Sequence, residues 1–365
     1  MMNLYKPIIK LGEAEIRALE NTSKNILDQI EPIIEITRGR KRTASNSKEV
    51  EELYPFNNRL EKLKQLFNGK NISIDLTSDE SLTSKQIIFL YNPEDGYKNW
   101  INFLCELKKE NIFSNITPCL IINGNDDNFE KNLKQQAQSL VANFGKFIYR
   151  NSLLDENCYG DLKVLDSVID NMIFLLDCEY VSQAQKKDAI VKLTYRIDNL
   201  SSMTTNRLQN FIISATSFPK NISEIGDDKT DQFSLCEVEI HNKISDKFNH
   251  LNIVYSDYAS INPIRNDNIV MARGWIPRID VPLMESIYYI RERRPKGITS
   301  YASTYCEVAR QVVNTKQFPQ LYDNWGINQI LDCSEGASPS SAPSFWISVR
   351  MCIHIEQQCR RIYTI

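Results

Sequence analysis

Four acidic side chains attract attention because each lies within or at the end of an apolar run. They are Glu35 in IEPIIEIT, Asp75 in NISIDLTS, Asp177 in IFLLDCEY and Asp257 in LNIVYSDY. A buried carboxylate that has no partner is costly, so such residues are kept where they are paired, bind a cation or take part in a reaction. We therefore treat these four residues as candidate catalytic residues.

Carboxylates that gather at one place support two kinds of chemistry. Their oxygens are the ligands that a divalent cation prefers. Alternatively, Glu35 and Asp177 act as a general acid/base pair, in which burial and like charge raise one of the two pKa values. A network of charges that satisfy one another and only stabilise the fold is a third interpretation. The sequence does not choose between them, so a divalent cation stays open and the metal and cofactor stay unassigned.

Other polar residues at the ends of apolar runs are candidate ligand-binding residues: Lys10, Arg150, Ser214 and Tyr258. The motif RGWIPR adds Arg273 and Trp275, which are suited to stacking on a ligand or holding an anion, although Trp275 is equally suited to packing in a core. Arginines favour phosphate groups. A phosphate-bearing small ligand is therefore a candidate partner, and recognition of a nucleotide through Arg38, Arg40, Arg150 and Arg273 is a weaker alternative.

The elements that must position these residues are short apolar runs alternating with amphipathic segments. Strands are predicted at 7–11, 32–37, 72–77, 117–123, 146–150, 172–178, 210–216 and 251–255. Their lack of polar alternation is typical of parallel strands that are buried on both faces. Crossover helices are predicted between them, beginning near 13 and then at 58–67, 97–111, 128–143, 161–170, 182–199 and 234–248.

Eight such units predict an α/β fold, specifically a TIM-barrel-like (β/α)8 barrel over residues 1–265. The carboxyl ends of the strands in such a barrel meet at one mouth. We therefore expect Glu35, Asp75, Asp177 and Asp257 to converge there, together with Lys10 and Arg150. An open doubly wound sheet is the alternative fold. Its nucleotide-binding version is weakened because no strand is followed by GxGxxG or GxxxxGK[ST].

The last hundred residues depart from this alternation. Helices are predicted at 283–293, 301–314 and 345–361, and the Gly, Ser and Pro residues within 323–346 indicate loop. We expect residues 266–365 to form a C-terminal helical cap that packs on the barrel.

The composition excludes several classes of protein. A chain with 42% hydrophobic and 24% charged residues is typical of globular proteins, and its net charge of −3 provides no general attraction to nucleic acid or membrane. The N-terminus lacks the apolar core of a signal peptide, and no run of about 18 apolar residues suggests a membrane helix. Nine scattered cysteines without a CxxC motif favour the reducing cytoplasm.

Several motifs resemble the beta family proteins, which are named after the beta gene of a satellite phage's gop-beta locus. The N-terminal segments are YKPIIKLGEAEIRAL and IEPIIEITRG, and the C-terminal ones are DYASINP, RGWIPRIDVP, NWGINQILDCSEGA and SFWISVRMCIHI. The resemblance covers both ends of the chain but not residues 80–245. It implies a protein associated with phage exclusion whose namesake restrains a toxic partner, and it carries over no catalytic residues.

Two functions from different classes follow. The first is a cytoplasmic component of a phage-defence or toxin–antitoxin locus, which acts by binding a partner protein or a small ligand at the barrel mouth. The second is a hydrolase or phosphodiesterase that uses the acidic mouth, with or without a divalent cation. The sequence leaves open whether the protein is an enzyme.

Overall fold

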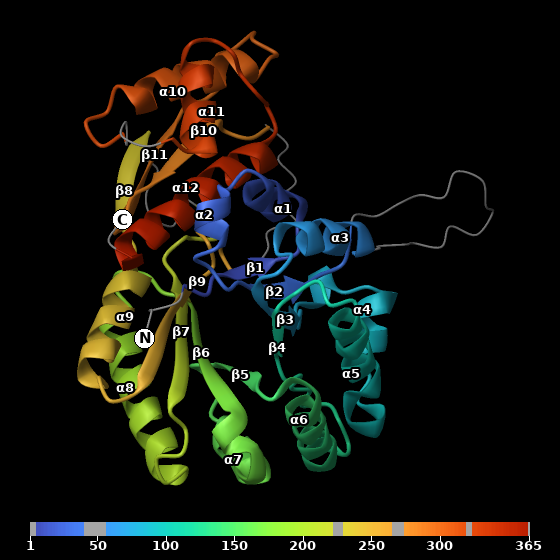
Figure 1. Ribbon diagram of the computed structural model, residues 1–365. Coiled ribbons are helices and arrows are strands. Elements are labelled where there is room, and N and C mark those ends of the chain that lie inside the picture. Colours follow the sequence, from blue (N-terminus) through green and yellow to red (C-terminus); the bar gives the residue numbers. More distant parts are fainter. Residues whose placement is uncertain (1–4, 40–55, 222–228, 265–273, 319–322, 364–365) are drawn as a thin grey trace, which may run out of the picture.

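Eight parallel strands form two four-stranded sheets at the centre of the molecule (Figure 1). The computed structural model describes residues 5–39, 56–221, 229–264, 274–318 and 323–363. The first sheet contains β1 (Ile8–Lys10), β2 (Ile33–Ile36), β3 (Asn71–Leu76) and β4 (Asn115–Pro118). The second contains β5 (Phe147–Ser152), β6 (Met172–Tyr180), β7 (Asn210–Thr216) and β9 (Asn252–Asp257). All eight predicted strands are present, although β4 ends earlier than predicted and leaves Asn123 in a loop.

Backbone hydrogen bonds connect the two sheets at both of their edges. At one edge Cys119 pairs in parallel with Ile148, and the amide of Leu120 donates to the Ile148 carbonyl at 2.8 Å. At the other edge the amide of Lys6 donates to the Tyr255 carbonyl at 3.1 Å. The predicted α/β class with parallel sheets is therefore confirmed.

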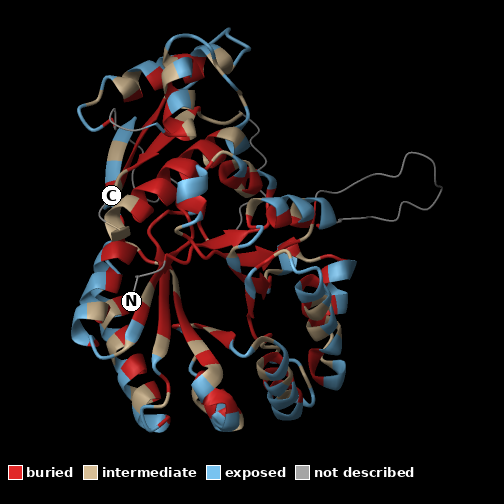
Figure 2. Cartoon of the chain, in the orientation of Figure 1, coloured by how far each residue is buried: buried red, intermediate tan, exposed pale blue. Residues whose placement is uncertain are grey.

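Helices cover the outer faces of both sheets, with their own outer surfaces exposed (Figure 2). They are α1 (Glu13–Glu20), α3 (Asn57–Leu66), α5 (Glu94–Lys109), α6 (Phe129–Phe144), α7 (Cys158–Val164), α8 (Lys186–Met203) and α9 (Cys236–Lys247). The short helices α2 (Lys24–Leu27) and α4 (Lys85–Leu90) were not predicted. In α5, Trp100, Leu104 and Leu107 recur at helical spacing and are buried, which is the apolar stripe of a helix on a sheet.

Side-chain alternation divides the strand residues between two environments. Residues such as Ile9, Ile34 and Phe211 pack outward against the helices. A separate apolar cluster lies on the inner faces and contains Ile8, Ile33, Cys119, Ile148, Leu175, Ile212 and Tyr258. Since side chains two residues apart share a face of a strand, the next inward residues are polar: Lys10, Glu35, Arg150, Asp177 and Ser214.

The C-terminal region contributes to a third sheet, which was not predicted from the sequence. Strands β10 (Arg278–Pro282) and β11 (Ser286–Arg291) form an antiparallel hairpin, and β8 (Thr230–Ser234) pairs with β11. The predicted helix over 283–293 is therefore wrong. The segment SIYYIR is β-branched and aromatic, and these residue types favour a strand once a partner strand is available.

Three helices complete this region: α10 (Ala302–Val313), α11 (Trp325–Ser334) and α12 (Pro343–Tyr363). We call β8, β10, β11 and these helices the cap. The helices predicted at 301–314 and 345–361 are present, but the predicted loop over 323–346 is wrong where α11 forms. That helix begins because the Asn324 side chain accepts hydrogen bonds from the amides of Gly326 and Ile327.

The cap and the parallel sheets are joined by α12. Its residues Met351 and Ile355 belong to the main core, whereas Val349 and Ile353 belong to the core of the cap. Strand β8 belongs to the cap sheet although it precedes residue 265, so the cap draws on both sides of the expected boundary. In the described part of the chain, no helix is both long enough and apolar enough to cross a membrane.

Candidate functional site

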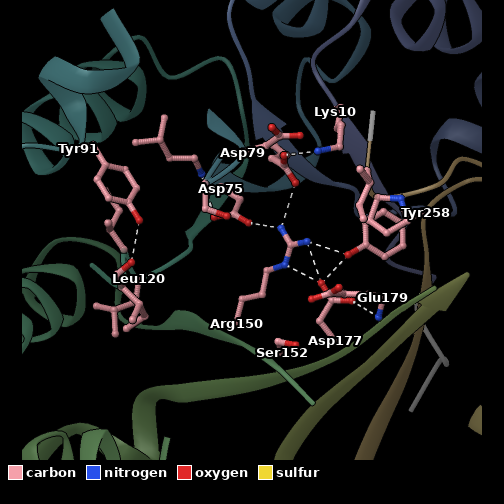
Figure 3. A pocket seen from close by; sticks show the side chains of 17 residues that line it. Lys10, Asp75, Asp79, Tyr91, Leu120, Arg150, Ser152, Asp177, Glu179 and Tyr258 are labelled. Atoms are coloured by element: carbon pink, nitrogen blue, oxygen red, sulfur yellow. Dashed lines mark hydrogen bonds and ion pairs between the residues drawn. The ribbon is translucent and has the colours of Figure 1, made fainter. Parts of the chain in front are cut away.

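A cavity of about 460 Å³ lies at the carboxyl ends of the parallel strands (Figure 3). Its charged lining residues are Lys10, Glu35, Asp75, Asp79, Arg150, Asp177 and Glu179. Its apolar wall includes Leu76, Tyr91, Leu120, Ile121, Ile122, Pro263 and Ile264. Ligand sites of parallel α/β folds lie at these strand ends because the loops there can vary without disturbing the sheet.

The charged residues form one side of the cavity, which we call its polar floor. Arg150, which comes from β5, lies at the centre of this floor (Figure 3). Its Nε and one terminal nitrogen both donate to Asp177 Oδ2, at 2.9 and 2.8 Å. The other terminal nitrogen donates to Asp75 Oδ2 at 2.7 Å and to Glu35 Oε2 at 3.1 Å. A fifth hydrogen bond, of 2.8 Å, reaches the hydroxyl of Tyr258. A guanidinium has five N–H groups, so every one of them is used.

The remaining members of the network hold these carboxylates in place. Lys10 donates to Glu35 Oε1 at 2.7 Å, and the Leu76 amide donates to Asp75 Oδ1 at 2.8 Å. The Tyr258 hydroxyl donates to Asp177 Oδ2. We call Lys10, Glu35, Asp75, Arg150, Asp177 and Tyr258 the mouth cluster.

The two neighbouring carboxyls Glu35 and Asp75 have pKa values that are displaced in opposite directions. Burial by itself would raise the pKa of Glu35, but the positive charges of Lys10 and Arg150 outweigh it and lower the pKa to about 2. For Asp75 burial prevails and, with the negative charge of Glu35, raises the pKa despite Arg150. The difference arises because Lys10 contacts only one of the two carboxyls.

A β-bulge directs Glu179 to the cavity. The pairing of β6 with β7 shifts register between Asp177 and Tyr180, and Glu179 adopts a left-handed φ of 55°. Its amide donates to Asp177 Oδ1 at 3.0 Å. Bulges and left-handed non-glycine residues concentrate at functional sites because they re-aim side chains at some cost in strain. The sequence analysis did not select Glu179, although its position two residues after Asp177 was a usable signal.

Asp257 does not lie in the mouth, and its predicted convergence with the other three acids is wrong. It is fully buried on the outer face of β9, where the hydroxyls of Tyr5 and Tyr255 donate to it at 2.7 and 2.9 Å. Its partner in α12 is His354, whose Nε2 lies 2.8 Å away. The reason is the alternation of the strand, because Ser256 and Tyr258 take the inward positions.

The other predicted ligand-binding residues are dispersed. Ser214 is buried beside Asp177 in register, but it does not line the cavity. Trp275 lies shortly before β10 and stacks on Tyr301, with ring centroids 4.0 Å apart. Neither of these two residues lines the cavity. Arg273 lies outside the described residues.

The carboxylates of the mouth cluster are engaged by cationic side chains rather than arranged around an empty centre. Within the ranges that the structure describes, no group of three or more His, Cys, Asp or Glu side chains is placed to hold a metal ion. The arrangement therefore favours hydrogen bonding and proton transfer at this site over coordination by these carboxylates.

The family model described as Beta protein matches residues 5–360. Protein beta of Enterobacteria phage P4 is 26% identical over 363 residues, which cover 97% of this chain and 92% of that protein. A solved structure of delta-aminolevulinic acid dehydratase (porphobilinogen synthase) from Toxoplasma gondii ME49 covers 71% of this chain and 83% of its own, at 9% identity and a TM-score of 0.32. A structural likeness this weak supports no inference.

Proposed function

This chain belongs to the Beta protein family, and on that premise we propose that it serves a phage-related locus by binding a small ligand at the mouth cluster. The observation that carries the proposal is the cavity of about 460 Å³ with its preorganised polar floor. Its volume is within the range of small-molecule sites, and a few fixed polar groups opposite an apolar wall are their usual lining.

Stability alone does not account for the mouth cluster. Replacing a buried network of ion pairs with apolar residues of similar volume is often neutral or stabilising. Here one arginine forms ion pairs with three carboxylates at the open end of the sheets, where Glu35 is 4% exposed. A costly polar arrangement that lines a cavity points to selection for binding.

We further propose that the two sheets act as one (β/α)8-like barrel. The backbone bonds at both sheet edges and the inward apolar cluster support this arrangement. The barrel places the ends of six strands around a single opening, so one ligand reaches all members of the mouth cluster.

In the locus, we propose a role in phage defence or in a toxin–antitoxin pair, with ligand binding as the signal and a partner protein as the target. The family relationship to a phage protein supports this context. All nine cysteines are free, which suits action in the cytoplasm.

An enzymatic function is the second candidate, as a hydrolase that works by acid/base chemistry. The observation that favours it is the pair Glu35 and Asp75, whose pKa values are displaced in opposite directions. Such pairs divide the roles of base and acid in known enzymes. Of the two, Glu35 is the one held ionised and Asp75 the one that takes up a proton more readily.

The test of the proposed function is a thermal-shift screen of the purified protein against nucleosides, sugars, amines and sugar phosphates. A ligand at about 100 times its Kd adds roughly 2.7 kcal/mol of stability, which moves the midpoint clearly. We expect the shift to disappear in Glu179→Gln, which leaves the folded core intact because Glu179 is only partly buried. The matched control is Glu106→Gln, an exposed position on α5. If no class of compound shifts the wild-type midpoint, the cavity is not a ligand site.

A further inference from the structure

We infer that the mouth selects neutral or cationic ligands that are rich in hydrogen-bond donors and rejects phosphate and carboxylate groups. This inference rests on the proposed function and names the ligand class of the same site. It reverses the expectation from the sequence, in which Arg150 suggested a phosphate-bearing ligand.

The first argument is that Arg150 has no donor left for an anion. All five of its N–H groups are committed to Asp177, Asp75, Glu35 and Tyr258, at 2.7 to 3.1 Å. An arginine that recognises phosphate does so with two parallel N–H groups. Arg150 would have to break contacts with carboxylates to provide them, so its role is to position the carboxylates.

The second argument is the balance of charge in the lining. Among the described residues, the cavity is lined by the five acids Glu35, Asp75, Asp79, Asp177 and Glu179 and by two cationic side chains, Lys10 and Arg150. In a partly desolvated cavity an incoming anion meets this excess of negative charge at low effective dielectric, which disfavours it strongly.

The third argument is the supply of hydrogen-bond acceptors. Each oxygen of Glu35 accepts a single hydrogen bond, and a carboxylate oxygen has room for two. No side chain in the described ranges donates to the Glu179 carboxylate, which lines the cavity. Among the described lining side chains, the donors that remain free are those of Lys10, which uses one of its three N–H groups on Glu35, and the hydroxyls of Ser78 and Ser152. Acceptors therefore outnumber donors, and the ligand must supply the donors.

The apolar wall completes the description of the ligand. Leu120, Ile121 and Ile122 line part of the cavity, and the Tyr91 hydroxyl donates to the Ile122 carbonyl at 2.7 Å. Tyr91 and Leu120 lie to one side of Arg150 (Figure 3). A molecule with a hydroxyl- or amine-bearing edge and an apolar face, such as a nucleoside or an amino sugar, fits both sides.

The experiment uses inorganic phosphate as the probe and needs no knowledge of the natural ligand. Binding to the full chain is measured by ³¹P line broadening for wild type, Asp75→Ala and Asp75→Ala/Arg150→Met. The Asp75→Ala substitution frees one N–H of Arg150 and removes one negative charge from the cavity. We therefore expect phosphate affinity to rise on the order of 10- to 100-fold, the effect of one charge-assisted hydrogen bond. The double variant should lose this gain. If Asp75→Ala does not fold, Asp75→Asn replaces it. Its amide oxygen still accepts from Arg150, so this variant tests the loss of the negative charge alone, and a smaller rise in phosphate affinity is expected.

Two outcomes overturn the inference. In the first, wild type binds phosphate as tightly as the variant; in the second, the folded variant gains nothing. In the first case the proposed function survives, because the mouth still binds a ligand. That function fails separately if the compound screen finds no ligand of any charge. Pairs of compounds with and without phosphate provide a direct comparison. Adenosine should bind at least as well as adenosine monophosphate, and glucosamine at least as well as glucose 6-phosphate. The reverse order contradicts the inference.

Discussion

Asp257 fastens the C-terminal helix to the sheets. Three side-chain donors converge on its carboxylate, namely the hydroxyl of the neighbouring Tyr255 and, from distant parts of the chain, the hydroxyl of Tyr5 and Nε2 of His354. Burial would raise the pKa of Asp257, but His354 and these hydrogen bonds together lower it below its ordinary value. A lowered pKa means that the carboxylate stabilises the fold above the pKa of the unfolded chain and that this contribution is lost as the pH falls.

We predict that Asp257→Asn lowers the free energy of unfolding by about 3 kcal/mol or more at neutral pH, because removing one member of a buried charged network leaves the others unpaired. Urea unfolding followed by circular dichroism measures this difference. The control is Asp198→Asn on the exposed side of α8, where surface substitutions change stability by about 0.5 kcal/mol or less. Equal midpoints for Asp257→Asn and wild type would contradict the role of Asp257.

Glu237 is a second buried carboxyl outside the cavity. Burial and, secondarily, the charge of Asp257 raise its pKa to about 8, although the Ser217 hydroxyl donates to it. In the unfolded chain the same group ionises near its ordinary value, so between these two values the folded protein binds the extra proton. Stability therefore falls as the pH rises from about 4.5 to 8.

We predict that Glu237→Gln, which resembles the protonated acid, gains stability relative to wild type as the pH rises. The gain should be near zero at pH 4 and on the order of 3 kcal/mol at pH 8, since each pH unit in this range contributes about 1.4 kcal/mol before other costs. Thermal midpoints of the two proteins across this pH range measure it. A gain that is independent of pH would show that Glu237 does not titrate in this range.

At the scale of elements, α11 and α12 pack with their backbones in close contact. A Cβ on Gly326 would lie 2.6 Å from the Val349 carbonyl oxygen and 2.8 Å from a side-chain carbon of Ile353. We predict that Gly326→Ala forces the helices apart and costs about 1–3 kcal/mol, the usual penalty of overpacking. Thermal melting measures this cost. The control is Gly160→Ala on α7, where a Cβ meets nothing within 4 Å and alanine should be neutral or slightly stabilising.

At the scale of the whole molecule, the cap and the parallel sheets share elements. Strand β8 lies between β7 and β9 in the sequence but pairs with β11 of the cap sheet. Helix α12 contributes to both hydrophobic cores. The Tyr363 hydroxyl near the end of α12 donates to the Gln29 carbonyl at 2.7 Å. These connections predict a single cooperative unfolding transition.

The four tryptophans allow this prediction to be tested. Trp100 lies on α5, whereas Trp275, Trp325 and Trp346 belong to the cap region. In Trp100→Phe, fluorescence reports on the cap and far-ultraviolet circular dichroism reports on the whole chain. We predict the same urea midpoint for both signals. Two separate midpoints would mean that the cap unfolds on its own.

Much of this architecture is determined by local sequence. Buried parallel strands need apolar residues on both faces. Runs such as MIFLLDC and NFIISAT can therefore be predicted as strands without knowing which strands lie beside them. The amphipathic helices follow for the same reason. The polar residues of the mouth cluster were found because they interrupt these runs, and Lys10, Glu35, Asp75, Arg150, Asp177 and Tyr258 do gather at one opening.

Two features depended on tertiary structure: which strands pair with each other, and which side chains face each other. Strand β8, TDQFS, carries no apolar pattern of its own, and it is a strand only because β11 offers it an edge. The side of β9 on which Asp257 lies follows from one residue of register, which the sequence leaves undetermined. The role of Arg150 depended on three carboxylates and the Tyr258 hydroxyl, which come from distant parts of the chain and together accept from all of its N–H groups. Sequence alone determines which side chains are buried and charged, whereas only the packed fold decides which of them face each other, because those contacts join residues far apart in the chain.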